Sequence, residues 1–104
     1  MKAPLQIGVE RDGFRTVVRC AGEVDQSSAG DLTNTLGEAM VSDAAELVLD
    51  LTGVGFMDST CLHAVIMAAT SAEAVGTRFT VTPSRPVERL LEMAGVRDIV
   101  QGRP

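Results

Sequence analysis

Hydrophobic and polar positions repeat with two different periods along the chain, and the changes between the periods predict the order of its elements. Apolar residues occupy alternate positions from Leu5 to Val9, as in a half-buried strand. Asp12-Gly13 is a favoured hairpin dipeptide because both residue types tolerate positive φ. Residues 14–21, FRTVVRCA, then form a second strand paired with the first, so the chain is expected to begin with a hairpin.

The middle of the chain changes from strand to helix and back. From Ser27 onward, apolar residues recur at helical spacing and predict a first helix. Residues 46–51, ELVLDL, are a short and nearly continuous apolar run that is typical of a buried central strand. Residues 52–55, TGVG, are expected to break this strand.

The last part of the chain predicts a helix, a strand and a further helix. The second helix runs from about Ser59 to Val75, and Gly76 follows where a left-handed C-terminal residue belongs. Residues 78–82, RFTVT, form the fourth strand. A third helix starts after the capping residue Ser84 with Pro86 in its first turn and closes at Gly95, and residues 97–100 are expected to add a short edge strand.

Strands and helices alternate after the opening hairpin, which indicates an α/β fold. Right-handed crossovers would give a mixed sheet of four or five strands with its helices packed largely on one face. A chain of 104 residues is one domain by length and can bury a modest core, so residues 1–104 are expected to be a single domain. The methionines at 57, 67 and 93 are expected to fill that core.

Charge and composition exclude several functional classes. The formal net charge of −5 argues against nucleic acid, which requires a basic surface. The only lysine is Lys2, so the fold lacks the lysine that a Walker-type phosphate loop, a Schiff base or a receiver domain needs. The longest apolar segment, residues 61–69, is too short for a membrane span of roughly 20 residues, and residues 1–20 contain no signal-peptide core. We therefore expect a cytoplasmic protein with no membrane insertion, whose two cysteines are thiols.

An acid and two hydroxyls, Asp58-Ser59-Thr60, stand at the beginning of the second helix. One interpretation is capping, since Asp and Ser satisfy the unpaired first-turn amides of a helix. The other is that an exposed hydroxyl there is a site of chemical modification. Ser59 and His63 are four residues apart and share a helix face, as a nucleophile and base would, but the chain has no G-x-S-x-G elbow. A small serine hydrolase is therefore the least favoured alternative.

Three segments together resemble a known family: GEVD at 22–25, LDLTGVGFMDST at 49–60 and TPSRPVERLLEMAGV at 82–96. They are similar to the STAS domain, and most closely to the bacterial anti-sigma factor antagonists. The resemblance implies the STAS fold and a switch function. In such antagonists, the first Ser after the Asp is phosphorylated by a serine kinase that is also the anti-sigma factor.

Residue by residue, the resemblance identifies Ser59 as the phosphorylated residue. It also implies a partner-binding surface made by Asp25, Asp58, Ser59 and Thr60. The family pattern usually continues as D-S-[ST]-G-L-G, and here Cys61 takes the place of the first of these glycines. His63 replaces the second, and many members have an additional C-terminal helix, for which little length follows Gly95.

The leading hypothesis is an anti-sigma factor antagonist that binds the anti-sigma serine kinase while unphosphorylated and so releases a sigma factor. Phosphorylation of Ser59 would end binding, and a serine phosphatase would reset the site. ATP and magnesium would belong to the kinase, so no cofactor, no metal and no enzymatic activity are expected in this chain. The alternative is a STAS subunit that serves a transporter or a larger signalling assembly without being phosphorylated.

Cys61 allows two interpretations. Its place in the first turn of the second helix suits a thiol of lowered pKa, because the helix dipole stabilises the thiolate, and oxidation there would alter the surface beside Ser59. The alternative, which we favour, is a small buried apolar residue.

Overall fold

The computed structural model of the protein describes residues 4–41 and 45–96, and its elements follow the predicted order. The first two strands form the expected hairpin, with Gly13 at a φ of 63° in its turn. The elements are β1 (Gln6–Asp12), β2 (Arg15–Val24), α1 (Ala29–Val41), β3 (Glu46–Met57), α2 (Ser59–Val75), β4 (Arg78–Pro83) and α3 (Arg85–Ala94).

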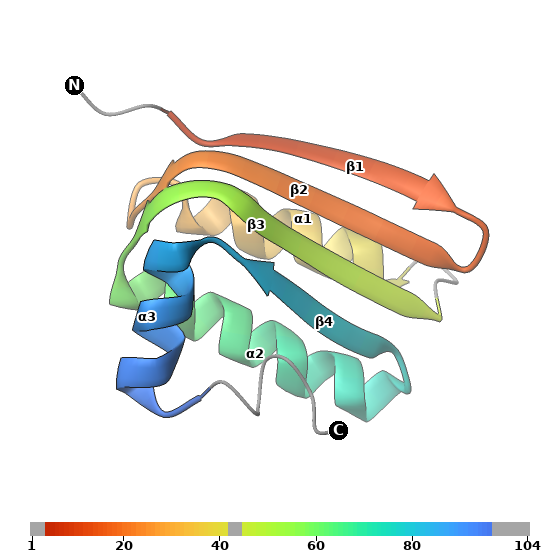
Figure 1. Ribbon diagram of the computed structural model, residues 1–104. Coiled ribbons are helices and arrows are strands. Elements are labelled where there is room, and N and C mark those ends of the chain that lie inside the picture. The colour runs from red at the N-terminus through yellow and green to blue at the C-terminus, as the bar shows by residue number, and fades with distance from the viewer. Residues whose placement is uncertain (1–3, 42–44, 97–104) are drawn as a thin grey trace.

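The strands form one mixed sheet in the order β1-β2-β3-β4 (Figure 1). β1 is antiparallel to β2, whereas β2, β3 and β4 are parallel to their neighbours. The prediction of an α/β fold with a mixed sheet is thus confirmed, with four strands in the described part of the chain. The expected edge strand at 97–100 lies outside the described residues.

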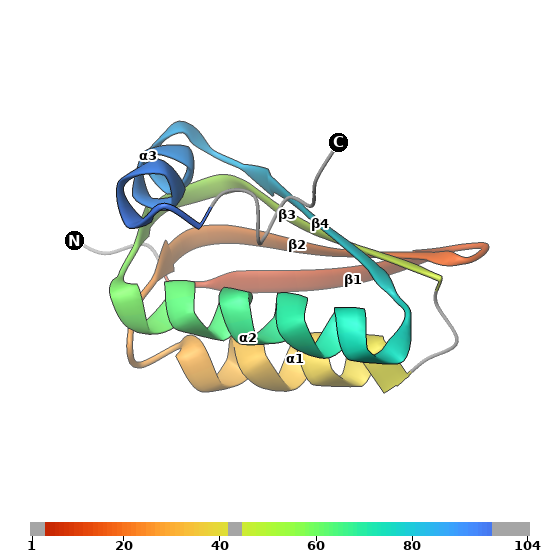
Figure 2. The same cartoon turned by 90° about the horizontal axis from the view of Figure 1, so that it is seen from below.

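Two helices cover one face of the sheet. Figure 2 shows α1 and α2 side by side beneath the strands, with the shorter α3 apart from them. The core lies between this helical layer and β2, β3 and β4, with Val87 and Leu91 added by α3, and its largest fully buried side chains are all Leu or Val. They are Leu32, Leu36, Leu47, Leu49, Leu51, Leu91, Val18, Val24, Val54, Val65 and Val87. The arrangement leaves the outer surfaces of α1 and α2 facing away from the sheet.

β3 is longer than the sequence predicts, because it continues through residues 52–55 to Met57. The expectation that the TGVG run breaks the strand is wrong. β2 shifts its register at this point, so that Ala21 pairs with Gly53 and Glu23 with Phe56. The backbone groups of these residues therefore remain in the ladder, and pairing with β2 compensates for the weak strand propensity of glycine. As a result, only Asp58 separates the end of β3 from the start of α2.

The C-terminal ends of α2 and α3 were predicted correctly, whereas the core positions of two methionines were not. Gly76 and Gly95 take left-handed conformations at the ends of α2 and α3. Met57 is buried, but Met67 and Met93 are 51% and 84% exposed, so their assignment to the core is wrong. Met67 lies off the stripe of α2 that faces the sheet. That stripe is made by Cys61, Leu62, Val65, Ala68, Ala69 and Ala72.

Candidate functional site

Asp58 is the N-cap of α2. Its backbone is extended, with φ −91° and ψ 175°, and its Oδ1 accepts a hydrogen bond from the backbone N–H of Cys61 at 3.0 Å. This contact satisfies one of the first-turn amides that have no partner within the helix. The backbone N–H of Asp58 donates to the Val24 carbonyl oxygen at 3.2 Å, so the first turn of α2 is fixed beside the end of β2.

Ser59 is the first residue of α2 and is exposed, as is Thr60 after it. Because the Asp58 carboxylate provides the cap, the Ser59 hydroxyl is not needed for that purpose. The first turn of a helix also carries a partial positive charge, which favours a negatively charged group there. The position can therefore accept a phosphate without loss of the helix cap.

Asp25 organises the turn that leads into α1. Its Oδ1 accepts hydrogen bonds from the Ser27 backbone N–H at 3.0 Å and from the Ser27 hydroxyl at 2.5 Å. Its carbonyl oxygen accepts from the backbone N–H groups of Ser28 and Ala29, each at 3.0 Å. Asp25 is thus a turn acid, and it remains half-buried at the surface.

The two acidic segments meet at Cys61. The Cys61 thiol donates a hydrogen bond to the Asp25 carbonyl oxygen at 3.2 Å, across 36 residues of sequence. The structure therefore brings the GEVD loop and the first turn of α2 together, as the resemblance implies. Phe56, just before this turn, is 44% exposed and adds an aromatic side chain that the sequence interpretation did not include.

Cys61 is fully buried, and burial raises the pKa of its thiol to about 12. A hydrogen bond of the thiol itself with Asp58 and the charges of Asp58 and Asp25 also raise this pKa, since they oppose a negative charge on the sulfur, and the backbone hydrogen bond to Asp58 lowers it by less. These effects outweigh the helix dipole on which the hypothesis of a redox-active thiol rests. They favour the alternative of a small buried apolar residue.

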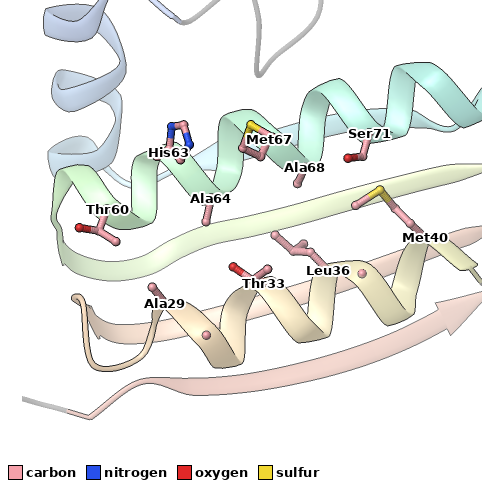
Figure 3. Close-up of a pocket in the computed structure, with 12 residues that line it drawn as sticks. Ala29, Thr33, Leu36, Met40, Thr60, His63, Ala64, Met67, Ala68 and Ser71 are labelled. Carbon is pink, nitrogen blue, oxygen red and sulfur yellow. The ribbon is translucent and has the colours of Figure 1, made fainter.

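A groove runs between α1 and α2, with a volume of about 510 Å³ (Figure 3). It starts at Thr60, next to Ser59, and among residues 4–41 and 45–96 no Asp, Glu, Lys or Arg lines it. Residues on both helices form its walls, including Gly30, Gly37, Met40, Thr60, His63 and Met67. The sequence interpretation missed this groove, although the spacing of the glycines along the first predicted helix was visible.

Two further observations concern classes of site. Among residues 4–41 and 45–96, no group of three or more His, Cys, Asp or Glu side chains is placed to hold a metal ion. In the same ranges, no helix combines the length and the apolar character that a membrane span requires.

Comparison with solved structures places these features in a known fold. An anti-sigma factor antagonist from Mycobacterium paratuberculosis is 27% identical, with a TM-score of 0.82 over 98% of this chain and 88% of that chain. The unphosphorylated form of SpoIIAA, a Bacillus protein, is 22% identical, with a TM-score of 0.75 over 88% of this chain and 83% of that one. A sulfate transporter family protein from Wolinella succinogenes is 18% identical, with a TM-score of 0.72 over 86% and 75%.

The last two likenesses show the fold alone, since their identities are low. None of the curated protein sequences compared with the chain matches it. A family model described as "Mlab, STAS domain" matches residues 7–101. Because that match runs from the second residue of β1 past the end of α3, the protein belongs to the STAS domain family.

Proposed function

We propose that this protein is an anti-sigma factor antagonist that is switched by phosphorylation of Ser59. Unphosphorylated, it binds an anti-sigma factor that is also a serine kinase, and the sigma factor is released. The observation that carries the proposal is the exposed Ser59 hydroxyl at the first position of α2, with the helix cap provided by Asp58. The similarity to the antagonist from Mycobacterium paratuberculosis supports it.

Phosphorylation would change the charge of this surface far more than its shape. A phosphate adds about 1.5 to 2 negative charges and three acceptor oxygens. It would stand beside the Asp58 carboxylate, in a region that Asp25 already makes acidic. The helix dipole stabilises this charge within the domain, whereas a docked partner would have to desolvate it. The modified protein therefore stays folded and loses affinity, about tenfold for each 1.4 kcal/mol of penalty.

The proposal assigns all chemistry to the partners. The kinase supplies ATP and magnesium, and a serine phosphatase restores the Ser59 hydroxyl. Asp25, Asp58, Ser59 and Thr60 form the contact surface and have no catalytic role. A hydrolase is poorly supported, because His63 is exposed at the rim of the groove and a general base requires a third group that orients it.

The departures from the family pattern affect this surface unequally. The Cys61 side chain is fully buried, so its extra bulk lies in the core and not on the face that a kinase would contact. His63 is exposed, so it alters that face directly. We infer that replacement of the first glycine is compatible with kinase recognition, and that His63 contributes to the choice of kinase.

A second candidate function is a subunit of a transporter or larger assembly that is not phosphorylated. A sulfate transporter family protein from Wolinella succinogenes has the same fold, so the fold is compatible with such a subunit. In that case the same surface would bind a partner permanently, and the Ser59 hydroxyl would remain unmodified.

One experiment separates the two functions. The wild-type protein and Ser59→Ala are used to capture partners from native lysate, and mass spectrometry identifies the captured proteins and the modified residues. The switch function predicts a serine kinase with both baits and phosphate on Ser59 of the wild type. Capture of a permease component, with Ser59 unmodified after incubation of the bait with lysate and ATP, would favour the second function. Thr60→Ala is the control, since it should still be phosphorylated on Ser59.

A further inference from the structure

The groove between α1 and α2, here called the α1–α2 groove, has no function in the switch described above apart from Thr60 and His63 at its end near Ser59. It is apolar in character, because the polar side chains among the described lining residues are those of Thr33, Thr60, His63 and Ser71, and none of them is an acid, a lysine or an arginine. In Figure 3, Ala64 and Ala68 point from α2 toward α1, while His63 and Met67 stand along the outer rim. The groove is thus an open apolar channel on the surface opposite the sheet.

Two glycines of α1, Gly30 and Gly37, lie seven residues apart and both line this groove. Neither has a positive φ, and a Cβ added to either would meet no atom within 4 Å. Glycine is also the least favourable residue inside a helix apart from proline. Neither the local backbone nor the packing of this domain therefore accounts for them. Their absent side chains leave room for another molecule to approach the α1 backbone closely.

Exposed methionine marks the opposite wall. Met67 on α2 is 51% exposed, and Met40, on the same helix as the two glycines, adds a half-buried methionine to the α1 wall. Flexible methionine side chains adapt to the shape of a bound surface. One wall thus permits close approach and the other supplies adaptable apolar contacts, as a surface that receives an apolar segment requires.

The size of a normal protein interface connects the groove with Ser59. A standard interface covers about 800 Å² on each partner, which corresponds to a radius of roughly 16 Å around its centre. α2 rises about 1.5 Å per residue, so Met67 lies roughly 12 Å along the helix from Ser59. A kinase that holds Ser59 at the centre of such an interface therefore also covers the near half of the groove.

We propose that the α1–α2 groove receives an uncharged, apolar segment of the same anti-sigma kinase that phosphorylates Ser59, most simply one face of a helix bearing Leu, Ile, Met or Phe. This inference rests on the proposed function. The interface with the kinase then has two ends. Phosphorylation disrupts the acidic end at Ser59, and the apolar end at the groove supplies affinity that does not depend on the phosphate. Among the described residues no charged side chain lines the groove, so a charged side chain of the kinase would find no partner there, and the groove favours an uncharged segment.

The first test fills the groove. The probe is the purified serine kinase, defined by its phosphorylation of Ser59 in the wild-type protein. Gly37→Leu places a large apolar side chain in the groove, whereas Glu38→Leu adds the same side chain to the next position of α1, outside the lining. Gly37→Leu should weaken kinase binding at least tenfold without lowering the Tm, since Leu favours helix and the site is open. Glu38→Leu should change the Kd less than threefold.

The second test introduces a charge. Met67→Glu places a carboxylate in the groove, and Met93→Glu makes the same change at another exposed methionine, on α3. Met67→Glu should weaken binding at least tenfold more than Met93→Glu does. Equal effects of the two substitutions, together with an unchanged Kd for Gly37→Leu, would overturn the inference.

Three other results would separate a failure of the proposed function from a failure of the inference about the groove. If no kinase phosphorylates wild-type Ser59, the proposed function fails and this inference fails with it. If the kinase phosphorylates and binds the groove variants as it does the wild type, only the inference about the groove is wrong. If Gly37→Leu instead abolishes self-association in sedimentation experiments and leaves kinase binding intact, the occupant is a second copy of this chain.

Discussion

The buried thiol of Cys61 donates a hydrogen bond to the backbone carbonyl oxygen of Asp25, 3.2 Å away, and so joins the first turn of α2 to the turn before α1. A glycine at position 61, as in the common family pattern, has no side chain to make this contact. In this protein the substituted residue therefore helps to hold the two acidic segments together beneath the exposed Ser59. The contact is in the core, and the surface above it remains free to bind a partner.

Ser59→Asp should remain folded and bind the kinase at least tenfold more weakly than the wild type. A carboxylate at the start of α2 interacts favourably with the helix dipole, by about 0.3 to 1 kcal/mol, so the Tm should not fall. Ser59→Ala should bind like the unmodified protein and escape phosphorylation. Isothermal titration with the purified kinase measures these affinities. An Asp variant that binds as tightly as the wild type would contradict the electrostatic switch.

Asp58→Ala should destabilise the fold by about 1 kcal/mol, because it removes the carboxylate that caps the Cys61 N–H. Asp58→Asn keeps an acceptor oxygen and should recover most of this loss. Urea unfolding of the three proteins measures the difference. If Asn and Ala variants are equally unstable, the negative charge and not the cap is what Asp58 contributes to stability.

Alkaline pH should destabilise the protein through its two thiols. Burial raises the pKa of Cys20 to about 11 and that of Cys61 to about 12, whereas an unfolded cysteine ionises near pH 8.5. Above that pH the unfolded chain loses protons that the folded chain keeps, so the free energy of unfolding falls as pH rises toward 11 and 12. The sequence has no tyrosine and one lysine, so few other groups titrate in this range.

Urea unfolding at pH 7.5 and pH 10 measures this dependence. Cys61→Ala should be less stable than the wild type at both values and should lose less stability between them. Both thiols of the native protein should also react far more slowly with a thiol reagent at pH 8 than those of the unfolded chain. Rapid reaction of Cys61 in the native protein would restore the redox hypothesis.

Gly53→Ala should cost about 1 to 3 kcal/mol, because the added methyl group overpacks the junction of β2 and β3. A Cβ at residue 53 would lie 3.0 Å from the Ala21 Cβ and 3.2 Å from the Cys20 carbonyl oxygen. Gly55→Ala is the matched control in the same strand, since a Cβ there meets nothing within 4 Å. Comparable stability of the two variants would show that β2 yields easily at its register shift.

The sequence by itself determined the order of elements, the hairpin, the helix ends and the family. These features depend on local chemistry: the period of apolar residues, the positive φ available to Gly13, Gly76 and Gly95, and the capping oxygens of Asp58 and Ser84. Each is decided within a few residues of the chain, so the pattern alone reveals it.

Tertiary structure alone decided the features that depend on contacts between distant segments. The TGVG run stays in β3 because β2 pairs with it. The strand propensity of these four residues does not include the stabilisation that a distant partner strand provides. Cys61 is buried against the Asp25 loop, and burial raises the pKa of its thiol, although its helical position favours a thiolate. Met67 is exposed at the edge of a groove, because the sheet covers only one stripe of α2 and Met67 lies outside that stripe.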